Sequence, residues 1–192
     1  MIKITAQGSL FVISGPSGVG KGSICELLRA RNPRLGYSIS ATTRKPRVGE
    51  LNGINYFFFS KGEFLDKIKA GDFLEWAEVY GNLYGTLKSY VEELQNQGKD
   101  VVLEIDTQGA MQVKKACPDS IFVFIMPPSA EELKKRIIKR GSESAESLHC
   151  RLSKSTEEMA LADQYDYIVI NADLNKAVQK VEQIINRYSS EA

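Results

Sequence analysis

Short apolar runs alternate with longer segments of mixed polar and apolar residues along most of the chain. The apolar runs predict strands at Leu10–Ser14, Tyr37–Ala41, Val101–Ile105, Ile121–Met126 and Tyr167–Ile170. The mixed segments predict helices at Lys21–Ala30, Ser89–Gln97, Gln108–Ala116, Ala130–Arg140, Glu146–Ala162 and Leu174–Tyr188. Runs such as Ile121–Met126 are apolar on both faces, as buried parallel strands must be. The alternation therefore predicts an α/β fold in which helices flank a parallel sheet.

A glycine-rich segment joins the first predicted strand to the first predicted helix. It comprises Gly15, Pro16, Ser17, Gly18, Val19, Gly20, Lys21, Gly22 and Ser23. The order of strand, glycine loop, lysine and helix is the P-loop arrangement that binds nucleotide phosphates. The glycines let the backbone approach a phosphate closely, and the N–H groups at the helix start bind the anion. Lys21 adds a positive charge for the outer phosphates.

The residue after Lys21 departs from the usual motif. Most P-loops have Ser or Thr there, with a hydroxyl that reaches a bound magnesium ion. This chain has Gly22, and Ser23 comes one position later. We therefore predict no direct protein ligand for Mg²⁺ and expect nucleotide phosphates and water to hold the ion.

Residues 37–88 interrupt the alternation of strands and helices. They hold a basic loop, a predicted strand at Asn55–Ser60, a short helix and a strand-like segment at Phe73–Val79. This stretch is too short for an independent domain and too long for a loop, so we expect a lobe inserted into the core. A second polar stretch, Gly141–Ser147, follows later in the chain. Two excursions beside a P-loop predict two mobile flaps over a nucleotide site.

Composition excludes several function classes. The 192 residues carry a formal net charge of +1, with 43% hydrophobic and 26% charged residues. These values are typical of an ordinary soluble globular protein and unlike a dedicated nucleic-acid binder. No apolar run reaches the ~20 residues that span a bilayer, and the N-terminal segment lacks an apolar signal sequence. We therefore expect neither nucleic acid nor membrane as a partner.

The few thiol and imidazole groups restrict the possible chemistry further. Cys25, Cys117 and Cys150 are odd in number and have no CxxC spacing, so we expect reduced thiols in a cytoplasmic protein. Cys25 is predicted to pack inside the first helix. His149 is the single histidine, which excludes a His-rich metal site and a Ser-His-Asp triad.

Two basic clusters are candidates for phosphate binding. Arg44 and Arg47 flank Pro46 in the inserted lobe, and guanidinium groups bind phosphate through two parallel hydrogen bonds. Arg136 and Arg140 lie one helical turn apart, so they share a helix face. Such clusters are also typical of solvated surfaces, so the residues alone leave both interpretations open.

Several motifs in order along the chain resemble those of guanylate kinases. They are Ser38–Arg47 with Gly49-Glu50 and Asn52-Gly53, then Phe73–Ala77, Asn82–Thr86 and Leu103–Gly109. The resemblance extends from about Gly8 to Tyr188 and fits the bacterial single-domain form. It implies a P-loop NTPase fold with one domain at 8–188. Within it, the core is expected at about 1–36, 89–127 and 160–192, a lobe that binds the nucleoside monophosphate (NMP) at about 37–88, and a LID at about 128–159.

The resemblance implies the reaction ATP + GMP ⇌ ADP + GDP, with dGMP as a further acceptor and a role in recycling GMP within purine metabolism. ATP and GMP are the expected partners, Mg²⁺ is the expected cofactor, and the chain is expected to be a monomer or homodimer. The residues implied for GMP are Ser40, Arg44, Arg47, Tyr56, Glu75, Tyr84, Thr86 and Asp106. Those implied for ATP are the loop from Gly15 to Ser23 and Asn171. The implied catalytic residues are Lys21, Arg44, Arg136 and Arg151.

Glu75 carries the implied base selection. The guanine edge presents an N–H and an NH₂ side by side, and a carboxylate matches that pair of donors while repelling the acceptor nitrogen of adenine. Tyr56 is more ambiguous, since Asn55–Phe59 is also typical of a strand with core aromatics. The acceptor oxygen is already anionic, so the reaction needs positioning and charge stabilisation rather than a strong base.

Three other classes of function stay open. A related peptide-binding module that has lost catalysis would not need Lys21, Arg44 and Arg47, all of which are present. A GTPase would need an Asn/Thr-Lys-x-Asp motif, and the nearest string, Asn175–Val178, lacks the Asp. A kinase for AMP or dTMP is disfavoured by Glu75.

Overall fold

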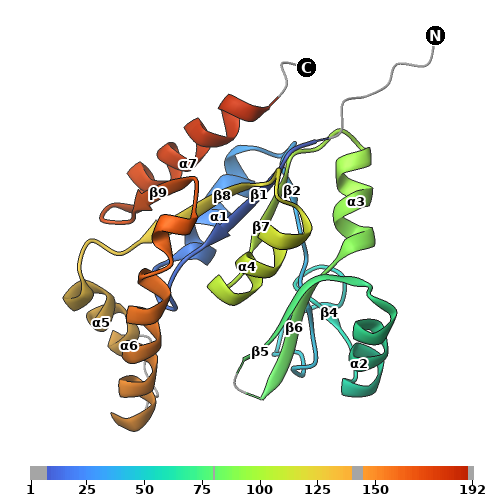
Figure 1. The fold of residues 1–192 in the computed structure, drawn as a ribbon, viewed down its shortest axis with the longest axis horizontal. Helices are drawn as coiled ribbons and strands as arrows, with labels where there is room; N and C mark the ends of the chain where they lie inside the picture. The colour runs from blue at the N-terminus through green and yellow to red at the C-terminus, as the bar shows by residue number, and fades with distance from the viewer. Residues whose placement is uncertain (1–7, 80, 140–144, 190–192) are drawn as a thin grey trace.

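The computed structural model describes residues 8–79, 81–139 and 145–189 (Figure 1). Its central sheet contains β1 (Leu10–Ser14), β2 (Gly36–Tyr37), β7 (Val101–Glu104), β8 (Ile121–Met126) and β9 (Tyr167–Ile170). The strand order is β2-β7-β1-β8-β9 and every pairing is parallel. The carboxyl ends of β1 and β7 therefore meet at one edge of the sheet, which is where parallel α/β sheets bind ligands.

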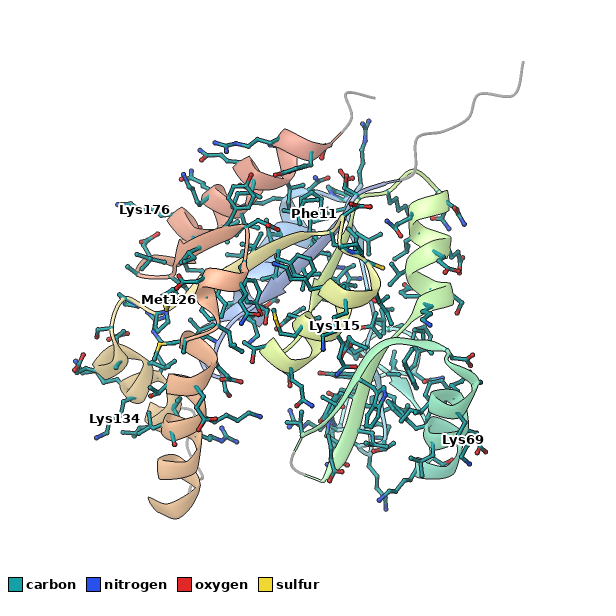
Figure 2. The ribbon with its side chains drawn as sticks, in the orientation of Figure 1. Phe11, Lys69, Lys115, Met126, Lys134 and Lys176 are labelled. Carbon is teal, nitrogen blue, oxygen red and sulfur yellow. The ribbon has the colours of Figure 1, made fainter. Side chains whose placement is uncertain are left out.

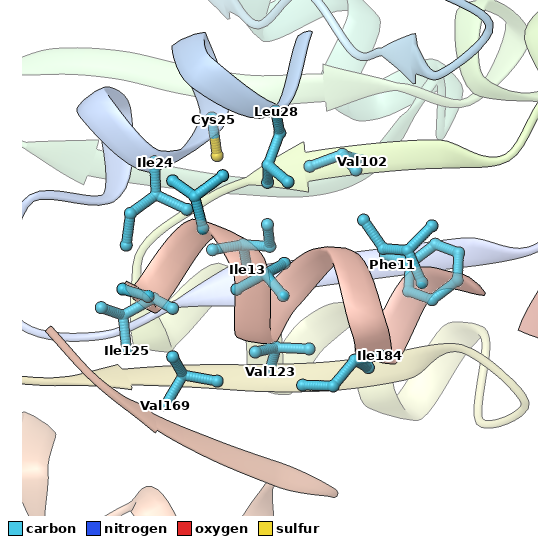
Figure 3. Packing of buried hydrophobic residues seen from close by; sticks show 14 of the residues in the cluster. Phe11, Ile13, Ile24, Cys25, Leu28, Val102, Val123, Ile125, Val169 and Ile184 are labelled. Carbon is cyan, nitrogen blue, oxygen red and sulfur yellow. The ribbon is translucent and has the colours of Figure 1, made fainter. Parts of the chain in front are cut away.

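Helices cover both faces of this sheet. Those that pack on it are α1 (Lys21–Arg31), α3 (Lys88–Asn96), α4 (Thr107–Ala116) and α7 (Leu174–Tyr188). The connection from β8 to β9 contains α5 (Ala130–Lys139), α6 (Ala145–Met159) and a 3₁₀ turn, η1 (Ala162–Gln164). One core cluster joins α1 and α7 to the sheet through residues such as Phe11, Ile13 and Ile184 (Figure 3). Cys25 lies in this cluster, as predicted. A second cluster packs α3 and α4 against the opposite face through Leu103.

A second, smaller sheet belongs to the inserted stretch. It contains β3 (Ala41–Thr42), β4 (Phe57–Phe58), β5 (Phe73–Val79) and β6 (Asn82–Leu87), in the order β4-β3-β6-β5. The β3–β4 pairing is parallel and the others are antiparallel. Helix α2 (Lys61–Ala70) packs on this sheet through Phe64, which is fully buried and stacks on Phe73. This unit and the α5–α6 pair extend away from the central sheet on two sides (Figure 1).

The structure corrects some of the predicted boundaries. The predicted strand Tyr37–Ala41 is in fact two strands in different sheets, because β2 ends at Tyr37 and the chain crosses to the small sheet before β3. The predicted strand Asn55–Ser60 is only β4, and β6 was not predicted. The predicted helix Glu146–Ala162 ends at Met159.

Three further observations concern the ends and the lengths of the helices. The capping box at the start of α2 is present, because the Ser60 hydroxyl accepts from the Glu63 N–H and the Glu63 carboxylate accepts from the Ser60 N–H. Arg140 and Gly141, the predicted end of the α5 helix, lie outside the described residues. None of the helices in the described ranges is both long enough and apolar enough to cross a membrane.

Candidate active site

The glycine loop connects β1 to α1 at the carboxyl edge of the central sheet. Gly15, Gly18 and Gly20 have φ angles of 144°, 84° and 100°, in the region that favours glycine. A Cβ atom on Gly15 would lie 2.3 Å from the Ile125 carbonyl oxygen, so a side chain there is excluded. The first turn of α1 contains no acidic residue, and among the described residues no side chain caps it. The amide groups at this helix start are therefore available to an anion.

Lys21 folds back over this loop. Its Nζ donates to the carbonyl oxygens of Gly15 and Pro16, at 2.6 and 3.2 Å. Burial lowers the pKa of Lys21, and the nearby carboxylates of Glu104 and Glu158 oppose this shift. The structure thus holds the ammonium beside the loop and among carboxylates, ready to exchange its carbonyl partners for phosphate oxygens.

Asn171 and Arg136 contact the loop at Val19, on the side where ATP is predicted to bind (the donor side). Asn171 lies just after β9, is 5% exposed, and donates from Nδ2 to the Val19 carbonyl oxygen at 2.8 Å. Arg136 of α5 donates from Nη1 to the same oxygen at 3.4 Å and from Nε to Glu132 Oε1 at 3.0 Å. A cavity of about 580 Å³ lies here, lined by Gly18, Gly20, Ser23, Arg136, Asn171, Ala172 and Leu174. By contrast, Lys134 of the same helix is exposed on its outer side (Figure 2).

A second cavity, of about 250 Å³, lies between the central sheet and the small sheet. The residues predicted to bind the acceptor that line it are Ser40, Tyr56, Glu75, Tyr84 and Asp106. Lys21 lines it as well. The fold therefore brings together residues that are far apart in the sequence, and Tyr56 lines this cavity rather than the core of the lobe.

Glu75 enters this cavity because of the alternation along β5. Glu75 and Ala77 share the buried face, whereas Trp76 is 39% exposed on the other face. Glu75 itself is 5% exposed, and the Thr86 hydroxyl donates to its Oε1 at 2.7 Å. Burial raises the pKa of Glu75 to about 7, with a further increase from Asp106 and an opposing effect of the Thr86 hydrogen bond.

The start of α4 closes the cavity behind Glu75. Asp106 caps this helix by accepting the Gly109 N–H at 2.7 Å. A Cβ atom on Gly109 would lie 2.5 Å from Glu75 Oε2. Gly109 therefore leaves the room that the carboxylate occupies, a role that sequence reasoning did not assign to it.

The two predicted phosphate arginines of the lobe differ in their surroundings. Arg44 makes two hydrogen bonds of 2.9 Å to the Glu50 carboxylate, and its guanidinium lies 5.2 Å from the centre of the Tyr56 ring. The hydrogen bonds from Arg44 lower the pKa of Glu50 to about 2. Arg47 is exposed, and its backbone N–H donates to Glu50 at 2.7 Å. Glu50 thus organises this loop, although it had no role in the sequence prediction.

Glu104, at the end of β7, was also missed as a site residue. The Tyr37 hydroxyl donates to its Oε2 at 2.6 Å, and a Cβ atom on Gly22 would lie 3.4 Å from its Oε1. Burial and the Glu104 charge raise the pKa of Tyr37. The signal in the sequence was a carboxylate near the end of a predicted strand, where the strands of a parallel sheet place their site residues.

A third cavity, of about 140 Å³, separates the glycine loop from α6. Arg151, Lys154 and Glu158 of α6 line it, facing Gly15, Ser17, Lys21, Val79 and Asp106. Lys21, Val79 and Asp106 also line the second cavity, which is called the acceptor cavity because residues predicted to bind the acceptor line it. The two cavities therefore share a boundary at Lys21, and α6 brings Arg151 to it. Among the described residues, no cluster of three or more His, Cys, Asp or Glu side chains forms a metal site.

Comparisons with known proteins agree with this geometry. The guanylate kinase family model matches residues 7–188. A guanylate kinase of Clostridium perfringens strain 13 is 54% identical over 93% of this chain and 83% of its own length. One of Caldanaerobacter subterraneus is 52% identical over 96% of this chain and 89% of its own length.

Solved structures give the same result. The crystal structure of a guanylate kinase from Anaplasma phagocytophilum matches with a TM-score of 0.78 and 30% identity, over 98% of this chain and 89% of that one. A shikimate kinase from Bacteroides thetaiotaomicron, at 13% identity and a TM-score of 0.51, shares the fold alone. Together, the P-loop core, the inserted small sheet and these matches show that the chain is a kinase that belongs to the guanylate kinase family.

Proposed function

We propose that this chain transfers the γ-phosphoryl group of ATP to GMP, and to dGMP, giving ADP and the nucleoside diphosphate. The observation that carries the proposal is the position of Lys21, which lines both the acceptor cavity and the cavity beside Arg151. A phosphoryl group moving from the loop toward the acceptor would stay within reach of this one ammonium. Such an activity would return GMP to the purine nucleotide pool.

In this proposal Glu75, Thr86, Asp106 and Ser40 bind guanine. The ionised Glu75 carboxylate accepts the two adjacent N–H donors of the guanine edge, and the Thr86 hydrogen bond fixes its orientation. Adenine would place an acceptor nitrogen against the same buried carboxylate. Because an unpaired buried polar group costs about 1–3 kcal/mol, this contact discriminates between the two purines.

The GMP phosphate is held by Arg44, Arg47, Tyr56 and Tyr84 in this proposal. Arg44 lies over the Tyr56 ring and is oriented by Glu50, which presets its guanidinium plane before substrate arrives. A planar guanidinium binds phosphate through two parallel hydrogen bonds.

The donor lies along the segment Gly15–Ser23, with its base beside Asn171. Backbone amides of the loop and Lys21 hold the phosphates, and Arg136 and Arg151 approach the moving group. The acceptor oxygen carries charge already, so these residues act by alignment in line and by stabilising charge as it shifts.

Magnesium fits this arrangement as a nucleotide-bound ion. Gly22 supplies no hydroxyl, and Glu104 is an oxygen ligand next to Gly22 and Lys21. Carboxylate oxygens and water are the partners Mg²⁺ prefers, so Glu104 and Ser23 would hold it through water. When bound, the ion neutralises phosphate charge.

Closure of two mobile parts completes the proposal. Residues 37–88 would close over GMP as the NMP-binding lobe, and residues 128–159 would close over ATP as the LID. Closure expels water, which protects ATP from hydrolysis, and assembles the arginines only when both substrates are bound.

A panel of nucleoside monophosphates tests the function directly. With ATP and Mg²⁺, ADP release in a coupled assay should be fast with GMP and dGMP and near background with AMP, dTMP, CMP and UMP. Equal rates with AMP would contradict the role of Glu75. No turnover with any acceptor, in protein that binds GMP, would instead indicate a binding module.

A further inference from the structure

Glu158 is a buried carboxylate that the proposed reaction does not use. It lies near the C-terminal end of α6, is 6% exposed, and its Oε2 accepts the backbone N–H of Ser17 at 3.3 Å. The two residues are 141 positions apart in sequence. Burying a carboxylate is costly unless it gains specific partners, so this contact between α6 and the glycine loop calls for an explanation.

The surroundings of Glu158 connect it with the phosphate site. Glu158 lines the same cavity as Arg151 and Lys154. These residues lie at spacings of three, four and seven along one helix, so they share a face. Lys21 and Asp106 approach the same carboxylate from the loop and from α4. One helix face therefore presents a cation toward the phosphate path and an acceptor to the loop that holds the donor.

The two ends of α6 have different surroundings. Its N-terminal end projects away from the core with α5, and its C-terminal end returns to the central sheet (Figure 1). Near that end Ser155 is 1% exposed and Glu158 is 6% exposed. Glu158 thus lies at the end of the helix that is fixed, two turns from Arg151.

We propose that Glu158 is a positioning residue: by holding the Ser17 amide it fixes the distance between the donor loop and α6, and so places Arg151 against the transferring phosphoryl group. This inference rests on the proposed role of Arg151. It assigns the effect to the hydrogen bond that Glu158 accepts, so the negative charge of the carboxylate is not required.

Substitutions at Glu158, with a matched control on the same helix, test the proposal. Glu158→Ala should lower kcat for ATP and GMP by about 30-fold, with KM for GMP changed by less than about threefold, because Glu158 does not line the acceptor cavity. Glu158→Gln keeps an oxygen acceptor and should stay within about threefold of the parent. Glu157→Ala, exposed one residue away, should match the parent. Melting temperatures confirm that each variant is folded.

A double-mutant cycle separates positioning from general stabilisation. If Glu158 acts through Arg151, adding Glu158→Ala to Arg151→Ala should cause little further loss of kcat. Multiplied losses, or a Glu158→Gln as poor as Glu158→Ala, would overturn the inference but leave the role of Arg151. An unimpaired Arg151→Ala would remove the role of Arg151, and the inference with it.

If Glu158→Ala does not fold, Glu158→Asp and Glu158→Gln still test the proposal. Glu158→Asp keeps the charge but shortens the side chain by one methylene, so it should be impaired in kcat while Glu158→Gln is not. The reverse order would show that the charge, rather than the hydrogen bond, matters and would overturn the proposal.

Discussion

The acceptor cavity and the donor side of the site are built in different ways. Glu75, which lines the acceptor cavity, is 5% exposed, and it is already hydrogen-bonded to Thr86, which is 1% exposed. On the donor side, Arg136 keeps 27% of its side chain exposed and Lys154 is also exposed. A base is recognised by short directional contacts that need a rigid, dry pocket. A polyphosphate is attracted over longer distances by charge, so its cations need less exact placement.

The largest expected effect is that of Lys21, where the two regions meet. Lys21→Ala should lower kcat about 1,000-fold, because the one ammonium shared by both cavities stabilises charge throughout the transfer. The melting temperature should change little, because the Lys21 hydrogen bonds in the described part of the chain go to two loop carbonyls, and the cost of burying its ammonium offsets the attraction of Glu104 and Glu158. Steady-state rates with Lys176→Ala, an exposed lysine on α7, provide the control. Turnover near that of the parent would contradict the P-loop assignment.

Glu75→Gln should separate the two regions most clearly. We expect kcat/KM for GMP to fall about 100-fold, since the amide NH₂ would oppose a guanine donor. ATP affinity, measured by calorimetry, should be unchanged. Glu78→Gln is the matched control, because Glu78 is exposed on the same strand. Equal loss in both variants, or a weakened ATP affinity, would contradict the assignment.

The same variant should not lose stability. A pKa raised from 4.5 to about 7 means that the folded state disfavours the ionised Glu75. That cost is absent at pH 4 and complete above pH 7, where it reaches roughly 3 kcal/mol. Chemical denaturation at pH 8 should therefore find Glu75→Gln at least as stable as the parent. A carboxylate that lowers the stability of the free protein is consistent with the proposed role of Glu75 in binding, because function is often gained at the expense of stability.

The two regions also differ in how far the sequence predicts them. The P-loop and the strands Ile121–Met126 and Tyr167–Ile170 were predicted accurately, because local pattern and backbone geometry define them. The prediction of a single strand at Tyr37–Ala41 was wrong, because β2 and β3 belong to different sheets and no local signal marks the crossing between them. The strand β6 was missed because Gly85 interrupts its apolar pattern.

Contacts between side chains that are not neighbours in the sequence were the least predictable part. Glu50 and Glu104 stand near recognised motifs, yet their partners Arg44 and Tyr37 become evident only in three dimensions. The motif resemblance identified side chains that line the cavities, because such residues are read one at a time. It said nothing of residues that act by holding the backbone, such as Glu158.

Arg44 tests the phosphate end of the acceptor region. Arg44→Met should raise KM for GMP about tenfold through the loss of charged hydrogen bonds, and leave KM for ATP within about twofold. Arg34→Met, an exposed arginine of the core, is the control. An effect on ATP alone would place Arg44 in the wrong region.

The last expected effect is a pH dependence specific to the acceptor, of about the same size as the effect at Arg44. Only the ionised Glu75 accepts both guanine donors, and its pKa in the free enzyme is about 7. The value of kcat/KM for GMP should therefore rise about tenfold from pH 6 to pH 8 and then level off. The GMP phosphate itself ionises near pH 6, so Glu75→Gln is the necessary reference: its profile should keep the phosphate step and lose the step near 7.

Asp106 and Thr86 are the groups that face Glu75. Because Asp106 raises the pKa, Asp106→Asn should move the step to lower pH, whereas Thr86→Val should move it to higher pH. Identical profiles in the parent and Glu75→Gln would show that the carboxylate does not titrate in this range, and the contrast between a desolvated acceptor pocket and a solvated donor side would then lose its electrostatic basis.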